Sequence, residues 1–373
     1  MSAVVMAAGE GTRMRSALPK PLHPLCGRPM VLHVLDALSE VVVERAVVVV
    51  GHGAEPVTKT LNEHSAPDLV IDFVEQHVQR GTGDAVAVAL TAFPDDDLDD
   101  GDIVVLPGDT PLVRPATLGH LIVEHRRADA AATLLTARLD DPTGYGRVVR
   151  GKDGAVRRLV EEADATEVER EIDEVGTSIY CFRRSLLAPA LRRLSPENAA
   201  GEYYLTDVID VLAQAGHKVI AVEAADPRET VGVNDRMQLA SAEAELRRRI
   251  NERWMKAGVT MLDPDNTVVD SAVRLSTDVA LYPGTILQGR TWVGAHARLG
   301  PNVRLVDCAV GDGARVQETV GRDAEIGPGA RVGPYASLAP GSHVAEGTTT
   351  GPFYTGVAGD EESPGLSGRE RRQ

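Results

Sequence analysis

Cysteine, aromatic residues and long apolar runs are all scarce in this chain of 373 residues. Its three cysteines, Cys26, Cys181 and Cys308, lie far apart and are odd in number, so they indicate neither a disulfide framework nor a metal-ligand pattern. No apolar run approaches the roughly 20 residues that span a membrane, and no basic leader precedes the first apolar stretch. We therefore expect a cytoplasmic protein that does not enter a membrane.

Positive charge is in deficit, because 39 lysines and arginines face 55 aspartates and glutamates, which gives a net charge of -16. This balance disfavours a nucleic-acid partner, since affinity for a nucleic-acid backbone comes from clustered lysine and arginine. A phosphate ligand would have to be held by a few local cations. The chain is also longer than one hydrophobic core usually supports, so we expect two domains.

The first 234 residues alternate short apolar runs with helical patterns and form the first expected domain. The runs lie at residues 4–6, 46–50, 69–73, 103–106 and 133–135. Such runs are typical of parallel strands buried on both faces, which predicts a three-layer, Rossmann-like α/β domain. Two further strand patterns flank the turn at 151–154, and they predict an antiparallel hairpin over residues 146–162 that forms a wall of the substrate site.

A polar helix over residues 235–258 is expected to connect this domain to a different architecture. Beyond it, aliphatic residues recur six apart, with small residues often following them, at Leu281, Leu287, Val293, Leu299 and Leu305 and again at Ile326, Val332, Leu338 and Val344. This hexapeptide repeat predicts a short left-handed parallel β-helix over residues 259–353. Leu305 and Ile326 are 21 residues apart, three more than a multiple of six, so we expect a loop or register break within 316–322. Residues 354–373 are polar and predict a disordered tail.

A glycine loop with two cations follows the first apolar run. Gly9 and Gly11 allow backbone N–H groups to approach phosphates, and Arg13 and Lys20 can neutralise a triphosphate. The loop is not a Walker loop, and Met14 stands where G-x-G-x-x-G has its last glycine. Two glycines that merely turn the chain into a helix are the alternative, but both cations at this spacing favour a nucleotide site.

Seven stretches in a fixed order resemble one family. They are Ala7-Ala8-Gly9-Glu10-Gly11-Thr12-Arg13-Met14, Leu18-Pro19-Lys20, Gln79-Arg80-Gly81-Thr82-Gly83, Pro107-Gly108-Asp109-Thr110-Pro111-Leu112, Asp141-Pro142-Thr143-Gly144-Tyr145-Gly146-Arg147, Gly201-Glu202-Tyr203-Tyr204-Leu205-Thr206-Asp207 and Gly232-Val233-Asn234. Over residues 1 to about 345 the chain is similar to GlmU, the bacterial bifunctional UDP-N-acetylglucosamine pyrophosphorylase and glucosamine-1-phosphate N-acetyltransferase family.

The resemblance implies UTP and a sugar 1-phosphate as substrates, Mg2+ as cofactor and a homotrimer formed through the β-helix. It places the nucleotide on Ala8, Gly9, Gly11, Thr12, Gln76, Gly81, Thr82 and Gly108, its phosphates on Arg13 and Lys20, the metal on Asp109 and Asn234, and the sugar on Gly146, Glu161, Gly176, Thr177 and Tyr203. Arg13, Lys20 and Asp109 would be the catalytic residues. Composition alone would favour a turn residue at Asp109, and only its place in the family pattern reverses that preference. For Glu161 the alternative is a solvated carboxylate beside Glu162.

The chemistry that the resemblance implies needs no protein nucleophile. The sugar phosphate oxygen would attack the α-phosphorus of UTP in line and expel pyrophosphate, so positioning and charge neutralisation would do most of the work. His33 and His120 are interpreted as helix-face residues rather than general bases, because the sequence pairs no nucleophile with them.

Two departures from the family pattern qualify the expectation. Gly176 stands where the family has an asparagine that contacts the sugar, which indicates weaker binding of N-acetylglucosamine 1-phosphate or a different sugar. Ala339 stands where the family has an arginine, and no lysine follows Lys256, so we expect acetyltransferase activity to be absent. The alternatives are the same chemistry on another sugar 1-phosphate or with dTTP, and a non-catalytic scaffold or regulatory subunit.

Overall fold

The computed structural model describes residues 1–51, 53–66, 68–93 and 101–358, and the chain divides into two compact units. The first comprises Met1–His23 and Pro29–Ala242, and the second comprises Pro24–Arg28 and the chain from Glu243 onward. The division falls inside the helix expected at 235–258. The sequence pattern gave no indication that residues 24–28 belong with the second unit.

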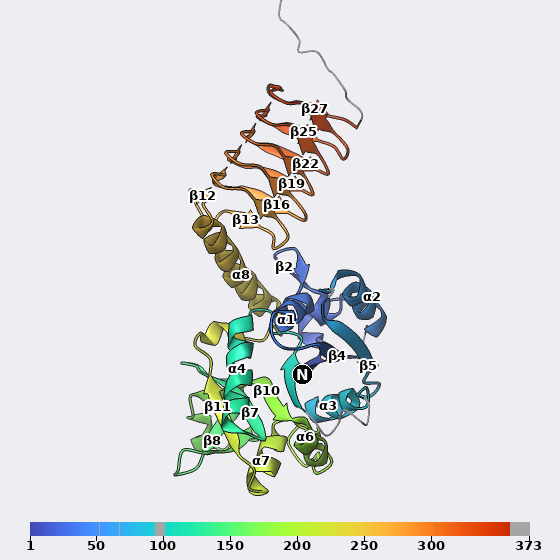
Figure 1. Cartoon of the computed structure of the whole chain (residues 1–373), viewed down its shortest axis with the longest axis vertical. Helices are drawn as coiled ribbons and strands as arrows, with labels where there is room; N and C mark the ends of the chain where they lie inside the picture. Colours follow the sequence, from blue (N-terminus) through green and yellow to red (C-terminus); the bar gives the residue numbers. More distant parts are fainter. Residues whose placement is uncertain (52, 67, 94–100, 359–373) are drawn as a thin grey trace, which may run out of the picture. The chain divides into compact units, whose positions relative to one another are not determined.

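The first unit is built on a mixed sheet in the order β11-β7-β10-β6-β1-β4-β5 (Figure 1). Its strands are β1 (Ser2–Met6), β4 (Arg45–Val50), β5 (Val70–Glu75), β6 (Asp102–Pro107), β7 (Ala132–Arg138), β10 (Glu174–Arg183) and β11 (Val219–Glu223). All five expected runs are strands. Strands β1, β4, β5 and β6 pair in parallel as expected, whereas β10, which was not among the five runs, lies antiparallel between β6 and β7.

The expected hairpin is present and pairs with an interior strand of this sheet. Strands β8 (Arg147–Arg150) and β9 (Val156–Val160) pair antiparallel, and β8 also pairs with β10. A separate two-stranded sheet joins β2 (Pro24–Leu25) to β3 (Arg28–Pro29). Strand β8 pairs with β10 at Val175, which also pairs with Ala137 near the carboxyl end of β7, and a ligand site is expected at this end of the strands in an α/β sheet.

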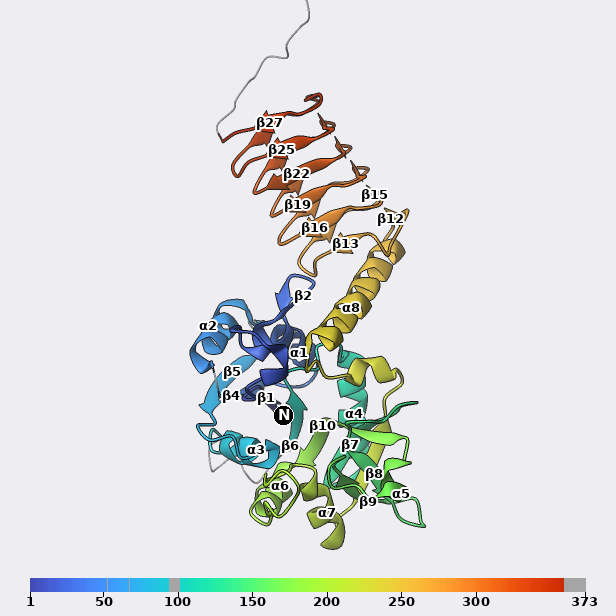
Figure 2. The same ribbon diagram turned by 180° about the vertical axis from the view of Figure 1, so that it is seen from behind.

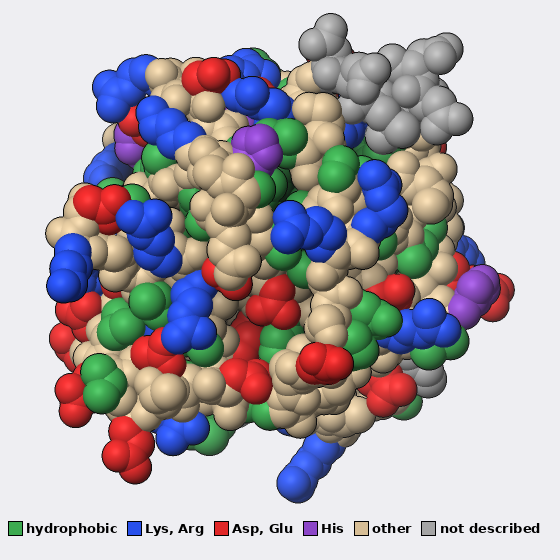
Figure 3. All heavy atoms as spheres, turned by 90° about the horizontal axis from the view of Figure 1, so that it is seen from below, with side chains coloured by type: hydrophobic (Ala, Val, Ile, Leu, Met, Phe, Trp, Pro, Cys, Tyr) green, Lys and Arg blue, Asp and Glu red, His purple; other side chains and the backbone are tan. Residues whose placement is uncertain are grey.

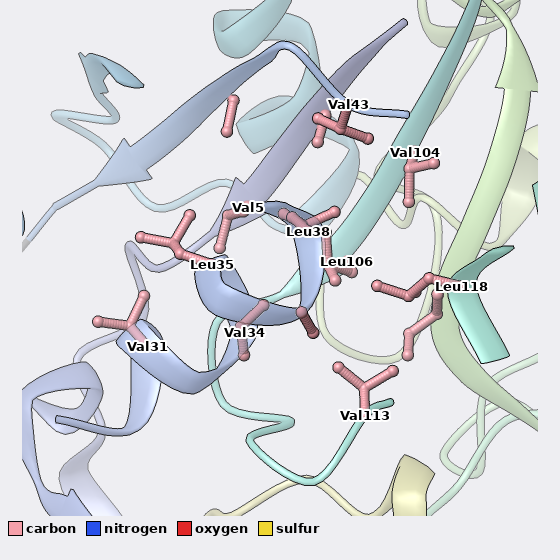
Figure 4. Close-up of a cluster of buried hydrophobic side chains, with 14 of the residues drawn as sticks. Val5, Val31, Val34, Leu35, Leu38, Val43, Val104, Leu106, Val113 and Leu118 are labelled. Atoms are coloured by element: carbon pink, nitrogen blue, oxygen red, sulfur yellow. The ribbon is translucent and has the colours of Figure 1, made fainter. Parts of the chain in front are cut away.

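Helices cover both faces of the first unit, which confirms the three-layer expectation (Figure 2). One core lies beneath α1 (Met30–Ser39), α2 (Ala54–His64) and α4 (Pro115–Ala128), and Figure 4 shows α1 side chains packed against residues of β1 and β6. The other lies beneath α3 (Thr82–Leu90), α6 (Arg184–Leu191), α7 (Asp207–Gln214) and the β8–β9 hairpin. Shorter helices occupy Thr12–Met14, Lys20–Leu22, Glu167–Arg170 (α5) and Pro227–Thr230. His33 and His120 lie in α1 and α4, on helices as expected.

Charged side chains of both signs lie on the surface of the described chain. Acidic and basic side chains are interspersed over the face drawn in Figure 3. Within the described ranges, no helix combines the length and apolarity that a membrane crossing requires.

Helix α8 (Arg236–Lys256) leads into the second unit, and Gly258 follows it at φ 95°. Leu246, Ile250 and Trp254 pack against the core of that unit, whereas Met237 is exposed. The unit is a left-handed β-helix, whose stacked coils form three parallel sheets (Figure 1). The sheets are β12 (Thr260–Met261), β15 (Ala280–Leu281), β18 (Arg298–Leu299), β21 (Arg315–Val316) and β24 (Arg331–Val332); β13 (Val268–Val269), β16 (Ile286–Gln288), β19 (Arg304–Val306), β22 (Thr319–Arg322), β25 (Ala336–Leu338) and β27 (Thr355–Gly356); and β14 (Arg274–Leu275), β17 (Trp292–Val293), β20 (Ala309–Val310), β23 (Glu325–Ile326) and β26 (His343–Val344).

The register break differs from the expected loop. Leu305 pairs with Gly321 in the next coil, and Val310 pairs with Ile326, so the interval from 305 to 326 holds four steps rather than three. Three of these steps are five residues long instead of six, at 305–310, 316–321 and 321–326. Each contains one non-glycine residue in the left-handed region, namely Asp307, Glu318 and Asp323. Tighter corners, not an insertion, therefore account for the spacing.

The sheet also continues past residue 354. Thr355 and Gly356 form β27 and pair with Ser337 and Leu338 of β25, so these two residues are ordered coil rather than tail. The remainder of the expected tail, residues 359–373, lies outside the described residues.

Candidate functional site

A cavity of about 500 Å³ opens in the first unit, where β1 and β6 end and the β8–β9 hairpin begins. It is lined by many of the predicted residues, namely Ala8, Gly9, Arg13, Lys20, Gln76, Gly81, Thr82, Gly108, Asp109, Gly146, Glu161, Gly176, Thr177 and Asn234. Within the described ranges, Gly11, Thr12 and Tyr203 are not among its lining residues. The fold therefore brings together residues that are more than two hundred positions apart in the sequence.

Two cations and two oxygen groups meet at one end of the cavity. Asp109 lies two residues after the end of β6, and its carbonyl accepts a hydrogen bond of 2.8 Å from the Val233 N–H, which places Asn234 beside it. The Lys20 ammonium forms an ion pair with the Asp109 carboxylate and donates to Asn234 Oδ1 at 2.9 Å. Arg13 donates to the same oxygen at 3.0 Å.

This arrangement fits a hard divalent cation. Lys20 Nζ shows that one positive centre can sit between the oxygens of Asp109 and Asn234, and Mg2+ prefers such oxygen ligands. Across the part of the chain that the structure describes, there is no group of three or more histidine, cysteine, aspartate or glutamate residues able to hold a metal. A metal here would complete its coordination with phosphate oxygens and water.

Gly11 and Thr12 do not line the cavity, but they position the residues of the loop that do. Gly11 has φ 63°, and a Cβ atom there would lie 2.6 Å from Cβ of Lys20. Thr12 begins the short helix Thr12–Met14 that carries Arg13. The glycine is therefore required so that Lys20 can pass close to the loop and reach Asp109.

The start of α3 forms a second side of the cavity. Buried Gln76 donates from its amide to the Gly81 carbonyl at 3.2 Å and to Asp84 Oδ2 at 2.7 Å, which leaves the Gln76 carbonyl oxygen as an acceptor for a base. Gly81 has φ 107°, and a Cβ atom there would lie 2.6 Å from the Tyr203 carbonyl oxygen. Tyr203 acts through its backbone, since its N–H donates to Arg80 and its carbonyl accepts from Gly83, both at 2.7 Å.

The lining of the cavity also includes Glu161, a carboxylate with a raised pKa. Glu161 Oε1 accepts a hydrogen bond of 3.0 Å from Thr206 Oγ1. Burial raises the pKa of Glu161, the Thr206 hydrogen bond lowers it, and the charge of Asp207 raises it further. A solvated carboxylate does not match this environment. The buried Thr177 hydroxyl, in contrast, donates to the Leu135 carbonyl at 2.8 Å and is engaged within the sheet.

Several lining residues were not predicted. Gln79 donates to the Ala8 carbonyl at 2.6 Å and fastens the glycine loop to the segment before α3. Leu159 and Tyr180 also line the cavity, although each is almost completely buried. Gln79 and Thr206 lie inside stretches that resemble the family and could have been singled out, whereas a leucine and a tyrosine in strands look like ordinary core residues.

Comparisons with known proteins agree with this geometry. Residues 3–205 match the MobA-like NTP transferase domain. The protein of Halalkalibacterium halodurans named bifunctional protein GlmU is 45% identical over 325 residues, which cover 87% of this chain and 70% of that protein. Proteins of the same name from Thermobifida fusca and Brevibacillus brevis are 48% and 45% identical, over 87% of this chain and 67% and 68% of their own lengths. The chain therefore belongs to the GlmU family and carries its nucleotidyltransferase domain in the first unit.

Proposed function

We propose that the first unit transfers a uridylyl group from UTP to N-acetylglucosamine 1-phosphate and releases pyrophosphate. The observation that carries the proposal is the meeting of Arg13, Lys20, Asp109 and Asn234 in a cavity whose lining also includes Glu161. Cations suit a triphosphate, and a carboxylate that accepts hydrogen bonds suits sugar hydroxyls.

The residues of the chain would act by positioning and charge neutralisation. A sugar phosphate oxygen forms a bond to the α-phosphorus, and the bond from that phosphorus to the β-phosphate bridging oxygen breaks. Lys20, released from Asp109 by the incoming phosphates, neutralises the negative charge that develops on the phosphate oxygens, and Arg13 assists from the same loop. Magnesium, when bound by Asp109 and Asn234, would add a further positive charge beside the phosphates.

The other residues would fix the two substrates in line. Gln76 offers its carbonyl oxygen to an N–H of the base, and the glycine at position 81 lets the backbone approach the nucleotide at the start of α3. Glu161 would accept hydrogen bonds from the sugar. Since the reaction needs no protein nucleophile, correct orientation accounts for much of the rate enhancement.

A second candidate is the same reaction on another sugar 1-phosphate or with dTTP, and Gly176 favours it because it brings no side chain to the sugar wall. A pyrophosphate-release assay with UTP and dTTP, each crossed against a panel of sugar 1-phosphates, distinguishes the candidates. The first proposal expects the highest kcat/KM with UTP and N-acetylglucosamine 1-phosphate. Absence of turnover with every pair would leave the non-catalytic scaffold.

Asp109→Ala is the sharpest variant for the metal site. It should lower kcat/KM by about 100-fold or more, because a preorganised charge at the reacting phosphates is lost. Asp210→Ala, a change on α7 outside the cavity, is the matched control. Near-normal turnover by Asp109→Ala, with an unchanged magnesium dependence, would remove the proposed metal site.

For the second unit we propose assembly into a homotrimer and no acetyl transfer. Ala339 next to Leu338 supplies no positive charge to an acetyl-CoA or sugar phosphate at the position where the family resemblance expects arginine. Mass photometry should report three copies, and an acetyl-CoA consumption assay with glucosamine 1-phosphate should show no turnover. A monomeric mass would contradict the proposed homotrimer. Measurable thiol release from acetyl-CoA would contradict the proposed absence of acetyl transfer.

A further inference from the structure

Leu159 occupies the space that a side chain at position 176 would need. A Cβ atom built on Gly176 would lie 2.7 Å from Leu159 Cδ2 and 2.9 Å from Cδ1. Both residues line the cavity, and only 3% of Leu159 is exposed. At this point the cavity wall therefore consists of the Leu159 side chain, from the β8–β9 hairpin, packed against the backbone of Gly176 in β10.

The groups next to Gly176 are engaged within the protein, and the carboxylate of Glu161 borders this wall on the side of Gly146. A Cβ atom built on Gly146 would lie 3.6 Å from both Leu159 Cδ1 and Glu161 Oε2. The Gly176 N–H already donates to the Gly146 carbonyl at 2.9 Å, and Thr177 is engaged within the sheet as described above. Glu161, which follows β9 directly, accepts from Thr206 through Oε1.

We propose that Leu159 and Gly176 act together as the specificity-determining pair of the sugar site, and that the substrate is a sugar 1-phosphate presenting a C–H face or a deoxy position to them. The inference rests on the proposed nucleotidylyl transfer and names the class of sugar that the site takes. A hydroxyl pressed against this wall would lose its hydrogen bonds to water and gain none from the protein.

The size of the preference follows from the chemistry of the wall. An apolar wall rejects an added hydroxyl only weakly, whereas a site built to bind a hydroxyl strongly rejects the analogue that lacks it. The native enzyme should therefore tolerate removal of the hydroxyl at the Leu159 wall and should depend on the hydroxyls that face Glu161.

The first test uses the full-length native chain, with the nucleotide and sugar 1-phosphate that give the highest kcat/KM, and with analogues that lack one hydroxyl each. At least one analogue should stay within about threefold of the parent, while those losing a bound hydroxyl should fall by about tenfold or more. A tenfold loss for every analogue would overturn the inference. Turnover of the parent sugar keeps the proposed function intact in that case, whereas absence of any turnover defeats the function itself.

The second test asks whether the two residues are coupled. Gly176→Asn alone should lower kcat/KM by about tenfold or more, because the Leu159 methyl groups must move. Leu159→Ala combined with Gly176→Asn should recover activity and make it dependent on the hydroxyl that the native chain ignores. Losses that simply multiply, or an unchanged analogue pattern in the double variant, would overturn the inference.

Val156→Ala is the matched control, because Val156 is buried in the same strand β9 without lining the cavity. It should lower thermal stability without changing the analogue pattern. Leu159→Val replaces Leu159→Ala if the larger truncation does not fold, and the analogue series on the native chain needs no variant at all.

Discussion

Glu161 and Glu162 are adjacent in sequence but are expected to affect stability in opposite directions. Burial raises the pKa of Glu161, and a carboxyl group whose pKa is higher in the folded chain destabilises that state as pH rises above the unfolded value, because the unfolded chain releases its proton first. Glu161→Gln keeps the oxygen that accepts from Thr206. It should raise the melting temperature at pH 8, leave it unchanged near pH 4, and lower kcat/KM by about tenfold.

Glu162→Gln provides the contrast. Glu162 Oε2 lies 2.7 Å from a guanidinium nitrogen of Arg147, whose side chain is only 2% exposed. Removing the carboxylate leaves that buried charge without its partner, so the free energy of unfolding should fall by about 1–3 kcal/mol. Thermal and urea unfolding of both variants at pH 8 measure the two signs, and shifts in the same direction would contradict the assignment.

Residue identity predicts this site well where charge is involved and poorly where shape is involved. Arg13, Lys20, Asp109 and Asn234 could be grouped from chemistry and family resemblance, and the fold brings them together. The supporting role of Gly11 became evident only from its distance to Lys20, because no sequence pattern states which residue a missing side chain makes room for. The role of Leu159 in the cavity wall could not be predicted from the sequence for the same reason.

At the scale of elements, a series of polar side-chain contacts connects α4 to β6 and β7. His125 on α4 lies 2.7 Å from Thr133 Oγ1 through Nδ1 and 3.3 Å from Asp102 Oδ1 through Nε2. The hydrogen bond with His125, together with one from Arg126, lowers the pKa of Asp102 to about 2 against burial, which acts in the other direction. The elements are therefore joined by an interaction that requires an ionised aspartate.

The expected consequence is a stability difference that depends on pH. A folded pKa below the unfolded value contributes stability above about pH 4, and that contribution is lost as pH falls from about 4 toward 2. Asp102→Asn should lower the free energy of unfolding by about 2 kcal/mol at pH 7, and the difference should shrink below pH 4. Urea unfolding at several pH values measures this.

Asp129→Asn is a suitable control for that series, because Asp129 pairs with Arg183 while its side chain is 90% exposed. An exposed pair contributes little, so this variant should match the native chain within about 0.5 kcal/mol at each pH. An equal loss in both variants would show that net charge, rather than the contacts of Asp102 with His125 and Arg126, controls the difference.

Apolar periodicity predicts where elements lie more reliably than how they pair. The five expected runs of the first unit are strands, but the direction of β10 depends on partners that are remote in sequence. In the β-helix the period of six was visible. Its three shortened corners were not, because the left-handed residues Asp307, Glu318 and Asp323 each donate a backbone N–H to a carbonyl of the preceding coil, a contact that no sequence pattern states.

On the scale of the whole molecule, two separate segments of the chain contribute to the second unit. Residues 24–28 belong to it, and the chain then returns to the first unit until residue 242. Within the second unit, the Cys26 N–H donates to Glu243 Oε2 at 2.7 Å, and the Cys26 carbonyl accepts from the Ser271 N–H at 2.9 Å. An early segment thus contributes to the packing of an element formed more than two hundred residues later.

Gly27 offers a test of that contribution. It has φ 78°, and a Cβ atom there would lie 2.6 Å from the carboxyl carbon of Asp270, whose side chain is held by the Gly289 N–H at 3.0 Å. Gly27→Ala should therefore destabilise the second unit by about 2 kcal/mol or more, through both backbone strain and overpacking. Both tryptophans of the chain, Trp254 and Trp292, belong to this unit, so their fluorescence reports its unfolding.

Gly154→Ala separates this local effect from general strain. Gly154 lies in the β8–β9 turn of the first unit at φ 77°, and among described residues nothing lies within 4 Å of its Cβ position. We expect Gly27→Ala to lower the urea midpoint of tryptophan fluorescence, and Gly154→Ala to leave that midpoint unchanged while lowering the midpoint for loss of pyrophosphate release. Equal shifts of the fluorescence midpoint in both variants would mean that the two units unfold as one, since strain placed in either would then be felt by the same transition.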